Sequence, residues 1–375
     1  MAISSPTSSW EVLLVGRLVV GVTAGLNTVL VPMYVSEIAP VSLRGGLGVF
    51  NQLAVTSGIF VGQILGLSQI LGNDDGWPWL LAVTVIPCVV QLAILFTSPR
   101  SPRYLAIAMG QVEEARKELM KLRNNDDEMV DRELEEMKEE KEAEQEPEMS
   151  IFQLLGSNKL RQALIICIVM HFSQQFSGMV AIFYYAVGFF ESAGISEDNA
   201  KYANLGVGAI MVAMTLVTIP LMDRLGRRVL HLTGLVGMCI MAILIVIAQN
   251  IMGEEPSGSE GGFLIASTLV FVVFFAVGPG SIPWMIAGEM FTQGPRPAAS
   301  SVVVFVNWAS NLTVGLVFPL VLIPQLQAFT FLPFAILLAA FSVFVFFFLP
   351  ETKGRTVGET TLLLQDRGWK PVLRA

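Results

Sequence analysis

The chain has 375 residues, of which 53% are hydrophobic and only 14% are charged. Its mean hydropathy of +0.64 lies well above that of soluble domains, so the composition predicts a polytopic membrane protein. The formal net charge of −8 resides in the loops and indicates no nucleic-acid partner. A lipid bilayer is therefore the first partner that we expect.

Nine apolar runs are long enough to cross a bilayer as helices. In chain order they cover residues 12–33, 46–70, 79–97, 162–190, 203–222, 229–251, 263–288, 299–323 and 327–349. They predict an all-α membrane fold with three spans in residues 1–97, six spans in residues 162–350 and a cytosolic tail at 351–375. Residues 98–161 mix both charges with Leu and Met at roughly helical spacing, which predicts a cytosolic helical linker. Short helices lying at the membrane face and a simple solvated linker both fit this pattern.

Basic residues set the expected orientation, because Lys and Arg stay on the cytosolic side of short loops. Almost all of the 23 basic residues fall in the loops of one side. The opposite loops carry acids and a single base, Lys201, and Arg17 alone lies within a span. The pattern predicts an extracellular N-terminus, a cytosolic C-terminus and, most simply, residence in the plasma membrane.

An internal repeat appears at an offset of 252 residues. It aligns "EIAPVSLR" with "EMFTQGPR" and Arg103 with Arg355, and it lays the first three spans over the last three. The spans between residues 162 and 251 find no counterpart. We therefore expect a six-plus-six architecture from which this chain lacks about the first three of twelve helices.

Features of enzymes and metalloproteins are missing from the sequence. It contains no nucleophile with a matching base, no phosphate-binding loop and no spacing of metal ligands, so we expect neither an enzyme nor a cofactor or metal. Cys88, Cys167 and Cys239 all lie in apolar runs and are interpreted as small core residues. His171 and His231 are interpreted as structural, because a single histidine seldom makes a proton relay.

Ten short motifs, each at the edge of a predicted span or within one, carry a resemblance to a known family. They are "GRLVVG" at 16–21, "SEIAPVSLRG" at 36–45, "NQL" at 51–53, "SPRYL" at 101–105, "QQFSG" at 174–178, "DRLGRR" at 223–228, "GPGSIPW" at 278–284, "EMFTQGPRPAA" at 289–299, "NW" at 307–308 and "PETKGRT" at 350–356. Together they resemble the sugar porter family of the major facilitator superfamily, most closely the facilitative hexose transporters. The resemblance implies twelve helices, alternating access and downhill movement of a monosaccharide such as glucose.

A sugar site needs amides that both donate and accept hydrogen bonds, and flat aromatic rings. The resemblance places sugar contacts at Gln52, Gln174, Gln175, Trp284, Asn307 and Trp308. Phe275, which flanks the break in "GPGSIPW", completes the predicted substrate-binding set. Intramembrane polar groups generally face the protein interior, which favours this interpretation. Alternatively, some of these amides only tie helices together.

The segment "GPGSIPW" cannot continue a regular helix, so a moving hinge or a plain packing kink is expected there. Val180, Met211 and Ala276 replace three polar residues of the hexose transporters. These replacements leave the preferred hexose open.

Charged residues gather at the predicted cytosolic ends of the spans. The resemblance assigns them to a gate that closes the inner face: Glu37, Arg44, Arg103, Asp223, Arg227, Arg228, Glu289, Arg296, Glu351 and Arg355. Alternatively, these charges only fix the orientation of the spans in the membrane. That would explain the arginines but not the acidic residues paired with them. Arg100 occupies the position at which the family has a glutamate in its proline-serine motif, so one acid expected in the gate is missing.

No predicted span carries a carboxylate near its centre, which favours a uniporter over a proton-coupled symporter. Facilitated hexose transport by alternating access is the leading hypothesis. The other hypothesis is a non-transporting isoform that acts as a sugar sensor or regulates a full-length partner. The sequence leaves oligomerisation open.

Overall fold

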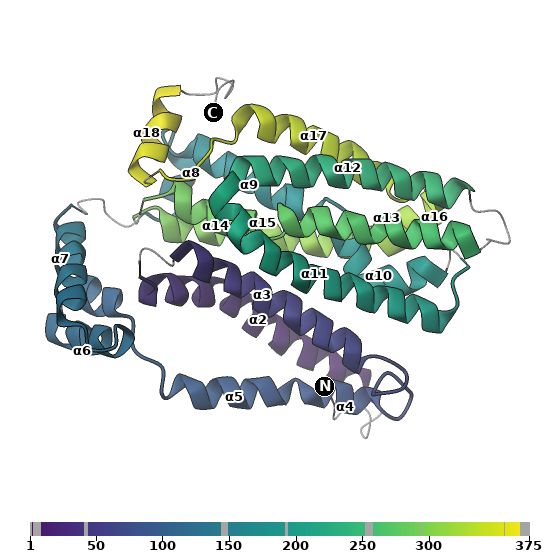
Figure 1. Cartoon of the computed structure of the whole chain (residues 1–375), viewed down its shortest axis with the longest axis horizontal. Helices are drawn as coiled ribbons and strands as arrows, with labels where there is room; N and C mark the ends of the chain where they lie inside the picture. The colour runs from purple at the N-terminus through teal and green to yellow at the C-terminus, as the bar shows by residue number, and fades with distance from the viewer. Residues whose placement is uncertain are drawn as a thin grey trace. The chain divides into compact units, whose positions relative to one another are not determined.

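The computed structural model describes residue 2 and residues 9–40, 44–143, 149–191, 194–251, 258–292, 294–355 and 357–367. All regular elements in these residues are helical, as Figure 1 shows. The chain divides into two compact units, one of residues 1–51 and 61–147 and the other of residues 52–60 and 148–375. The main division therefore falls inside the predicted linker, after residue 147.

The first unit contains the membrane helices α2 (Trp10–Ile38), α4 (Trp77–Val83) and α5 (Val85–Leu95), together with α3 (Arg44–Leu65) except for its residues 52–60. The hydroxyl of Ser9 caps α2 by accepting a hydrogen bond from the backbone N–H of Val12. Helices α2, α4 and α5 expose large apolar side chains along much of their length, as expected for surfaces in contact with lipid or with further helices.

The linker folds as a small helical bundle with its own core. It contains a π-helical turn η1 (Tyr104–Ala108), α6 (Val112–Leu122) and α7 (Asp127–Ala143). Leu105, Leu119 and Val130 are among the buried residues of this core. Arg123 forms an ion pair with Glu133 and also donates to the backbone carbonyl of Ile38, near the C-terminal end of α2. The bundle is therefore tied to the last turn of α2.

The second unit holds the remaining helices. They are α8 (Ile151–Gly156), α9 (Arg161–Gln175), α10 (Met179–Glu191), α11 (Glu197–Leu225), α12 (Arg227–Ile251), α13 (Gly258–Val277), α14 (Ile282–Met290), α15 (Arg296–Val317), η2 (Phe318–Leu322), α16 (Ile323–Leu326), η3 (Gln327–Phe329), α17 (Leu332–Phe348) and α18 (Val357–Arg367). Helix α12 packs against α13 and α17, α11 packs against α13, and α15 packs against α9 (Figure 1). This packing buries the core of the unit.

Two membrane helices in this unit are interrupted. Helices α9 and α10 are separated at residues 176–178, where Gly178 has a positive φ of 95°. Helices α13 and α14 are separated at residues 278–281, within "GPGSIPW". The interruption predicted at that motif is confirmed.

Seven helices are long and apolar enough to cross a membrane in the part of the chain that the structure describes. Two apolar helices, Phe50–Leu65 and Leu332–Phe348, correspond to the other two predicted spans but are shorter. The ninth predicted span began at residue 327, whereas α17 begins only at Leu332, because residues 327–329 form a separate 3₁₀ turn. Within the described residues the fold is therefore all-helical, with seven candidate spans of full length and two shorter apolar helices at the positions of the other two predicted spans.

The repeat seen in the sequence reappears in the helix boundaries. The offset of 252 residues carries α3, Arg44–Leu65, onto α15, Arg296–Val317. The same offset places α2 over α13 and α14, and places α4 with α5 over α17. Arg44 and Arg296 each form the first residue of a helix, so the two segments share their local structure.

Candidate functional site

Gln174 stabilises the interrupted helix between α13 and α14. Its side-chain nitrogen Nε2 donates to the backbone oxygens of Pro279 at 2.8 Å and Gly280 at 2.9 Å. In a regular helix the oxygen of Pro279 would accept from the residue four positions later, but that residue is Pro283, which has no N–H. The amide of Gln174 therefore supplies a donor that the backbone cannot, in a region where an unpaired carbonyl is costly.

Gln175 belongs to a network of amides that joins α9 to α15. Its Nε2 donates to Oδ1 of Asn307 at 2.8 Å, and its Oε1 accepts from Asn311 at 3.1 Å. Asn307 in turn donates to Oε1 of Gln174 at 2.7 Å. We call these four residues, Gln174, Gln175, Asn307 and Asn311, the amide network. Three of them are buried, and Gln175 retains the largest exposed fraction of those three, at 8%.

A histidine and two aromatic residues border the amide network. The ring nitrogen Nδ1 of His171 lies 2.9 Å from Nδ2 of Asn307, and its ring meets Trp284 edge to face at a centroid distance of 5.2 Å. Trp284 is half-buried. Tyr184 on α10 donates from its hydroxyl to Oδ1 of Asn311 at 3.1 Å. Polar groups from α9, α10 and α15 therefore converge beside an indole ring.

The other three predicted sugar contacts lie outside this group of bonded residues. Phe275 is buried and its ring meets that of Phe183 edge to face at 6.3 Å. Trp308 follows Asn307 in the chain, but 42% of it is exposed. Gln52 is half-buried on α3, and among the described residues it takes no part in the amide network.

Val180, Met211 and Ala276, which replace polar residues of the hexose transporters, are all buried in the second unit. Apolar side chains therefore occupy three buried positions where the family pattern would have polar groups.

Part of the predicted gate forms a cluster at the N-terminus of α12. Arg227 pairs with Glu289 at 2.8 Å, and Glu289 also accepts from the hydroxyl of Thr352. The carboxylate of Glu351 accepts from the backbone N–H groups of Arg227 at 2.9 Å and Arg228 at 3.1 Å. A carboxylate is favourable there, because the first N–H groups of a helix lack partners and its N-terminus is electropositive.

We call Arg227, Glu289, Glu351 and Thr352 the α12 cluster. Gly226 makes it possible: its φ is +86°, and a Cβ at this position would lie 2.5 Å from Oε2 of Glu351. Only glycine gives the carboxylate room to reach the helix end.

The side chains of the other gate residues lie in different settings, where the structure describes them. Arg228 donates to the backbone oxygen of Phe346, Arg296 donates to that of Phe291, and Arg355 is exposed. Glu37 and Arg103 belong to the first compact unit, and the side chains of Arg44 and Asp223 lie outside the described residues. Arg100 pairs with Glu114 at the surface.

The sequence reasoning missed one residue of the amide network, Asn311, and one residue that borders it, His171. His171 was interpreted only as structural, and Asn311 was not considered as a site residue. The signal for both is helical spacing, because residues three or four positions apart share one face of a helix. His171 precedes Gln174 and Gln175 by three and four residues, and Asn311 follows Asn307 by four.

Comparisons with known proteins identify the family. The family model for "Sugar (and other) transporter" matches residues 1–364. The facilitated glucose transporter member 4 of solute carrier family 2 from Mus musculus is 47% identical over 357 residues, which cover 95% of this chain and 69% of that protein. Member 2 from Gallus gallus is 42% identical and is covered to 66% of its length.

Solved structures show the same fold. The proton:xylose symporter XylE bound to 6-bromo-6-deoxy-D-glucose superposes with a TM-score of 0.71 at 27% identity, covering 90% of this chain and 71% of that one. The inward open conformation of XylE from E. coli gives a TM-score of 0.69 at 26% identity. These proteins are transporters rather than enzymes, and they are integral to membranes. This chain thus belongs to the sugar transporter family of the major facilitator superfamily.

Proposed function

We propose that this chain carries a hexose such as glucose across the membrane, down its concentration gradient, by alternating access. The observation that carries the proposal is the amide network, a set of donors and acceptors beside Trp284 within spans that otherwise suit lipid. Its relatives, named facilitated glucose transporters, favour the same substrate class.

The exposed fractions of its side chains suggest which residues of the amide network contact the sugar and which position them. Gln174 uses its donors on the helix interruption, and Asn307 is 1% exposed and bonded on both sides. Gln175 is more exposed, and its partner Asn311 is half-buried. We therefore assign sugar contact to Gln175, Asn311 and the indole of Trp284.

In this proposal, Gln174 and Asn307 hold the contacting groups in place. Phe275, Trp308 and Gln52 complete the proposed set of residues around the sugar.

Movement is assigned to the interrupted helices. Residues 278–281 lack a continuous helical ladder and depend on Gln174 for two of their hydrogen bonds. Bending there would change the distance between Trp284 and Gln175 and so open or close one side of the site. The predicted charged gate, of which the α12 cluster is one part, would close the inner face during this cycle.

Uniport is favoured by where the acids lie. In the seven full-length spans of the described chain, Asp and Glu occur only within two residues of either end, for example Glu289 in Glu260–Met290. A proton-driven mechanism needs a carboxylate inside the membrane. The charge pattern of the loops supports an extracellular N-terminus and a cytosolic C-terminus, with the plasma membrane as the proposed location.

The test is uptake of radiolabelled glucose into liposomes that contain only this chain. Loss of one or two hydrogen bonds to the sugar should reduce the transport efficiency of Gln175→Ala by about 5- to 150-fold. Gln91→Ala, which changes an exposed amide on α5, is the matched control and should transport normally. Saturable glucose binding without any uptake would contradict transport and support a sensor or regulatory role instead.

A further inference from the structure

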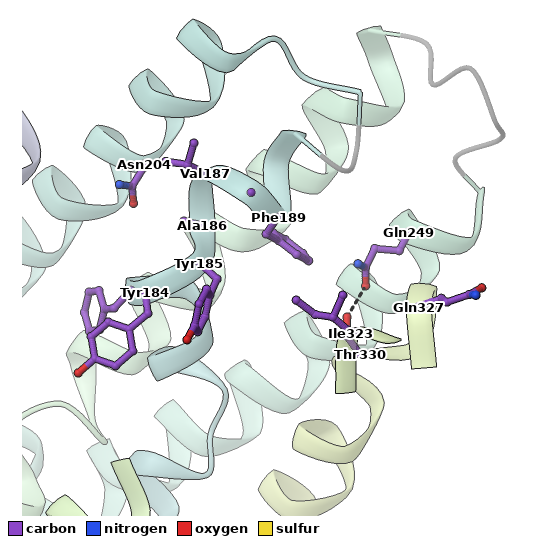
Figure 2. Close-up of a pocket in the computed structure, with 12 residues that line it drawn as sticks. Tyr184, Tyr185, Ala186, Val187, Phe189, Asn204, Gln249, Ile323, Gln327 and Thr330 are labelled. Atoms are coloured by element: carbon purple, nitrogen blue, oxygen red, sulfur yellow. Dashed lines mark hydrogen bonds between the residues drawn. The ribbon is translucent and has the colours of Figure 1, made fainter. Parts of the chain in front are cut away.

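A cavity of about 360 Å³ lies in the second unit, and none of the residues that line it belongs to the amide network. One wall is the stretch of α10 from Phe183 to Phe189, and the opposite wall comes from the end of α12, from α16 and from the turn around Thr330. Figure 2 shows the ring of Phe189 turned toward Ile323, with Gln249 and Thr330 beyond it. The volume of the cavity falls in the lower part of the range of about 300 to 1,000 Å³ found for small-molecule sites.

The two walls differ in chemistry. Aromatic rings dominate on α10, where Phe183, Tyr184, Tyr185 and Phe189 line the cavity. Two amides and a hydroxyl from the other wall also line the cavity, namely Gln249, Gln327 and Thr330, and a third amide, Asn204, comes from α11. None of the residues that line this cavity is an Asp, Glu, Lys, Arg or His. The cavity therefore suits a neutral molecule with a flat apolar group at one side and hydroxyl groups at the other.

Both walls are held in place by contacts of their own. The hydroxyl of Tyr185 donates to the backbone oxygen of Gly315 at 2.8 Å, and its ring lies 5.8 Å from that of Phe318. On the other wall, the hydroxyl of Thr330 donates to Oε1 of Gln249 at 3.4 Å, which Figure 2 marks with a dashed line. A site whose walls are already positioned binds without a large ordering cost.

Tyr184 links this cavity to the amide network. It lines the cavity and donates to Asn311, which donates to Gln175. A ligand that turns or displaces the Tyr184 ring would remove one partner of Asn311. Occupancy of the cavity can therefore alter the network without any overlap between the two sites.

We propose that this cavity is a second binding site, separate from the amide network, for neutral amphipathic glycosides that join an aromatic group to a hydroxylated ring. The aromatic group stacks on the α10 wall, and the hydroxyls bond to Gln249 and Thr330. The proposal goes beyond hexose transport and does not require that the chain transports glucose.

Equilibrium dialysis of radiolabelled phenyl β-D-glucoside against the full chain in lipid nanodiscs tests the proposal. Gly188 lines the cavity on α10, and a Cβ added there meets no atom within 4 Å, so Gly188→Leu fills the cavity without a backbone clash. This variant should bind the glycoside at least about tenfold more weakly, because its side chain takes the space of the ligand. Gly262→Leu is the matched control, since Gly262 is also an exposed helical glycine with no atom within 4 Å, and its affinity should equal that of the unmodified chain.

Two further variants distinguish binding in this cavity from binding at the amide network. Gln249→Leu removes a hydrogen-bonding group and should weaken binding by about three- to tenfold even if Gly188→Leu fails to fold. Gln175→Ala leaves every residue that lines the cavity in place, so saturable binding of the glycoside should persist in this variant, whether or not it transports glucose. Binding that persists unchanged in Gly188→Leu and Gln249→Leu, or that disappears only in Gln175→Ala, would overturn the proposal, as would the absence of saturable binding.

Discussion

Replacement of Gln174 by leucine tests the part that this residue plays at the helix interruption, and it also removes the oxygen Oε1 that accepts from Asn307. The substitution keeps a side chain of similar size but removes the donor that lies 2.8 Å from the oxygen of Pro279 and 2.9 Å from that of Gly280. Pro283 cannot replace it, because proline has no N–H. Each buried acceptor left without a donor costs about 1 to 3 kcal/mol, so Gln174→Leu should lower the free energy of unfolding by about 2 to 6 kcal/mol.

The measurement is equilibrium unfolding of the purified chain in mixed micelles, compared with two control variants. Gln91→Leu alters an exposed amide on α5 and should change the free energy of unfolding by less than about 0.5 kcal/mol. Gln175→Leu should destabilise less than Gln174→Leu, because its partners Asn307 and Asn311 are side chains that can turn toward other groups. If Gln174→Leu proves as stable as Gln91→Leu, the interruption finds its donors elsewhere and the reasoning is refuted.

Two further predictions concern the α12 cluster. Gly226→Ala should lower the free energy of unfolding by about 2 to 4 kcal/mol, through backbone strain at positive φ and displacement of the Glu351 carboxylate from the helix end. Gly354→Ala is its control in the same unfolding assay: φ is +69° there and no atom lies within 4 Å, so only the strain of about 1 to 2 kcal/mol should appear, and equal losses would contradict a steric role for Gly226. A double-mutant cycle with Arg227→Met and Glu289→Gln should give a coupling energy of about 1 to 3 kcal/mol, because these side chains are only 11% and 24% exposed; additive effects would show that the pair contributes nothing.

The sequence predicted the class of the fold, because long apolar runs can satisfy their backbone in lipid only as helices. It also predicted the interruption at 278–281, since two glycines and two prolines so close together do not continue a helix. It could not predict that the side chain of Gln174 donates hydrogen bonds to this interruption, because the amide and its acceptors are more than a hundred residues apart in the chain. Such contacts depend on how α9 packs beside α14, which no local pattern encodes.

The pair Gln174 and Gln175 illustrates the same limit at the candidate site. Two adjacent amides on one helix point in different directions, so the sequence could predict that both need partners within the membrane. Which of them faces backbone and which faces side chains follows only from the rotation of α9. Asn311 was overlooked for the same reason, since its bond to Gln175 depends on how α15 is oriented against α9.

The ion pair of Arg123 with Glu133 has a mechanical consequence. Because Arg123 also bonds to the carbonyl of Ile38, the last turn of α2 and the bundle of α6 and α7 are joined by charge as well as by chain. A tilt of α2 would therefore move Arg123 and, through the ion pair, Glu133 on α7. A spectroscopic probe on an exposed position of α7, such as Glu135, would report the tilt of a helix buried in lipid from a place that water reaches.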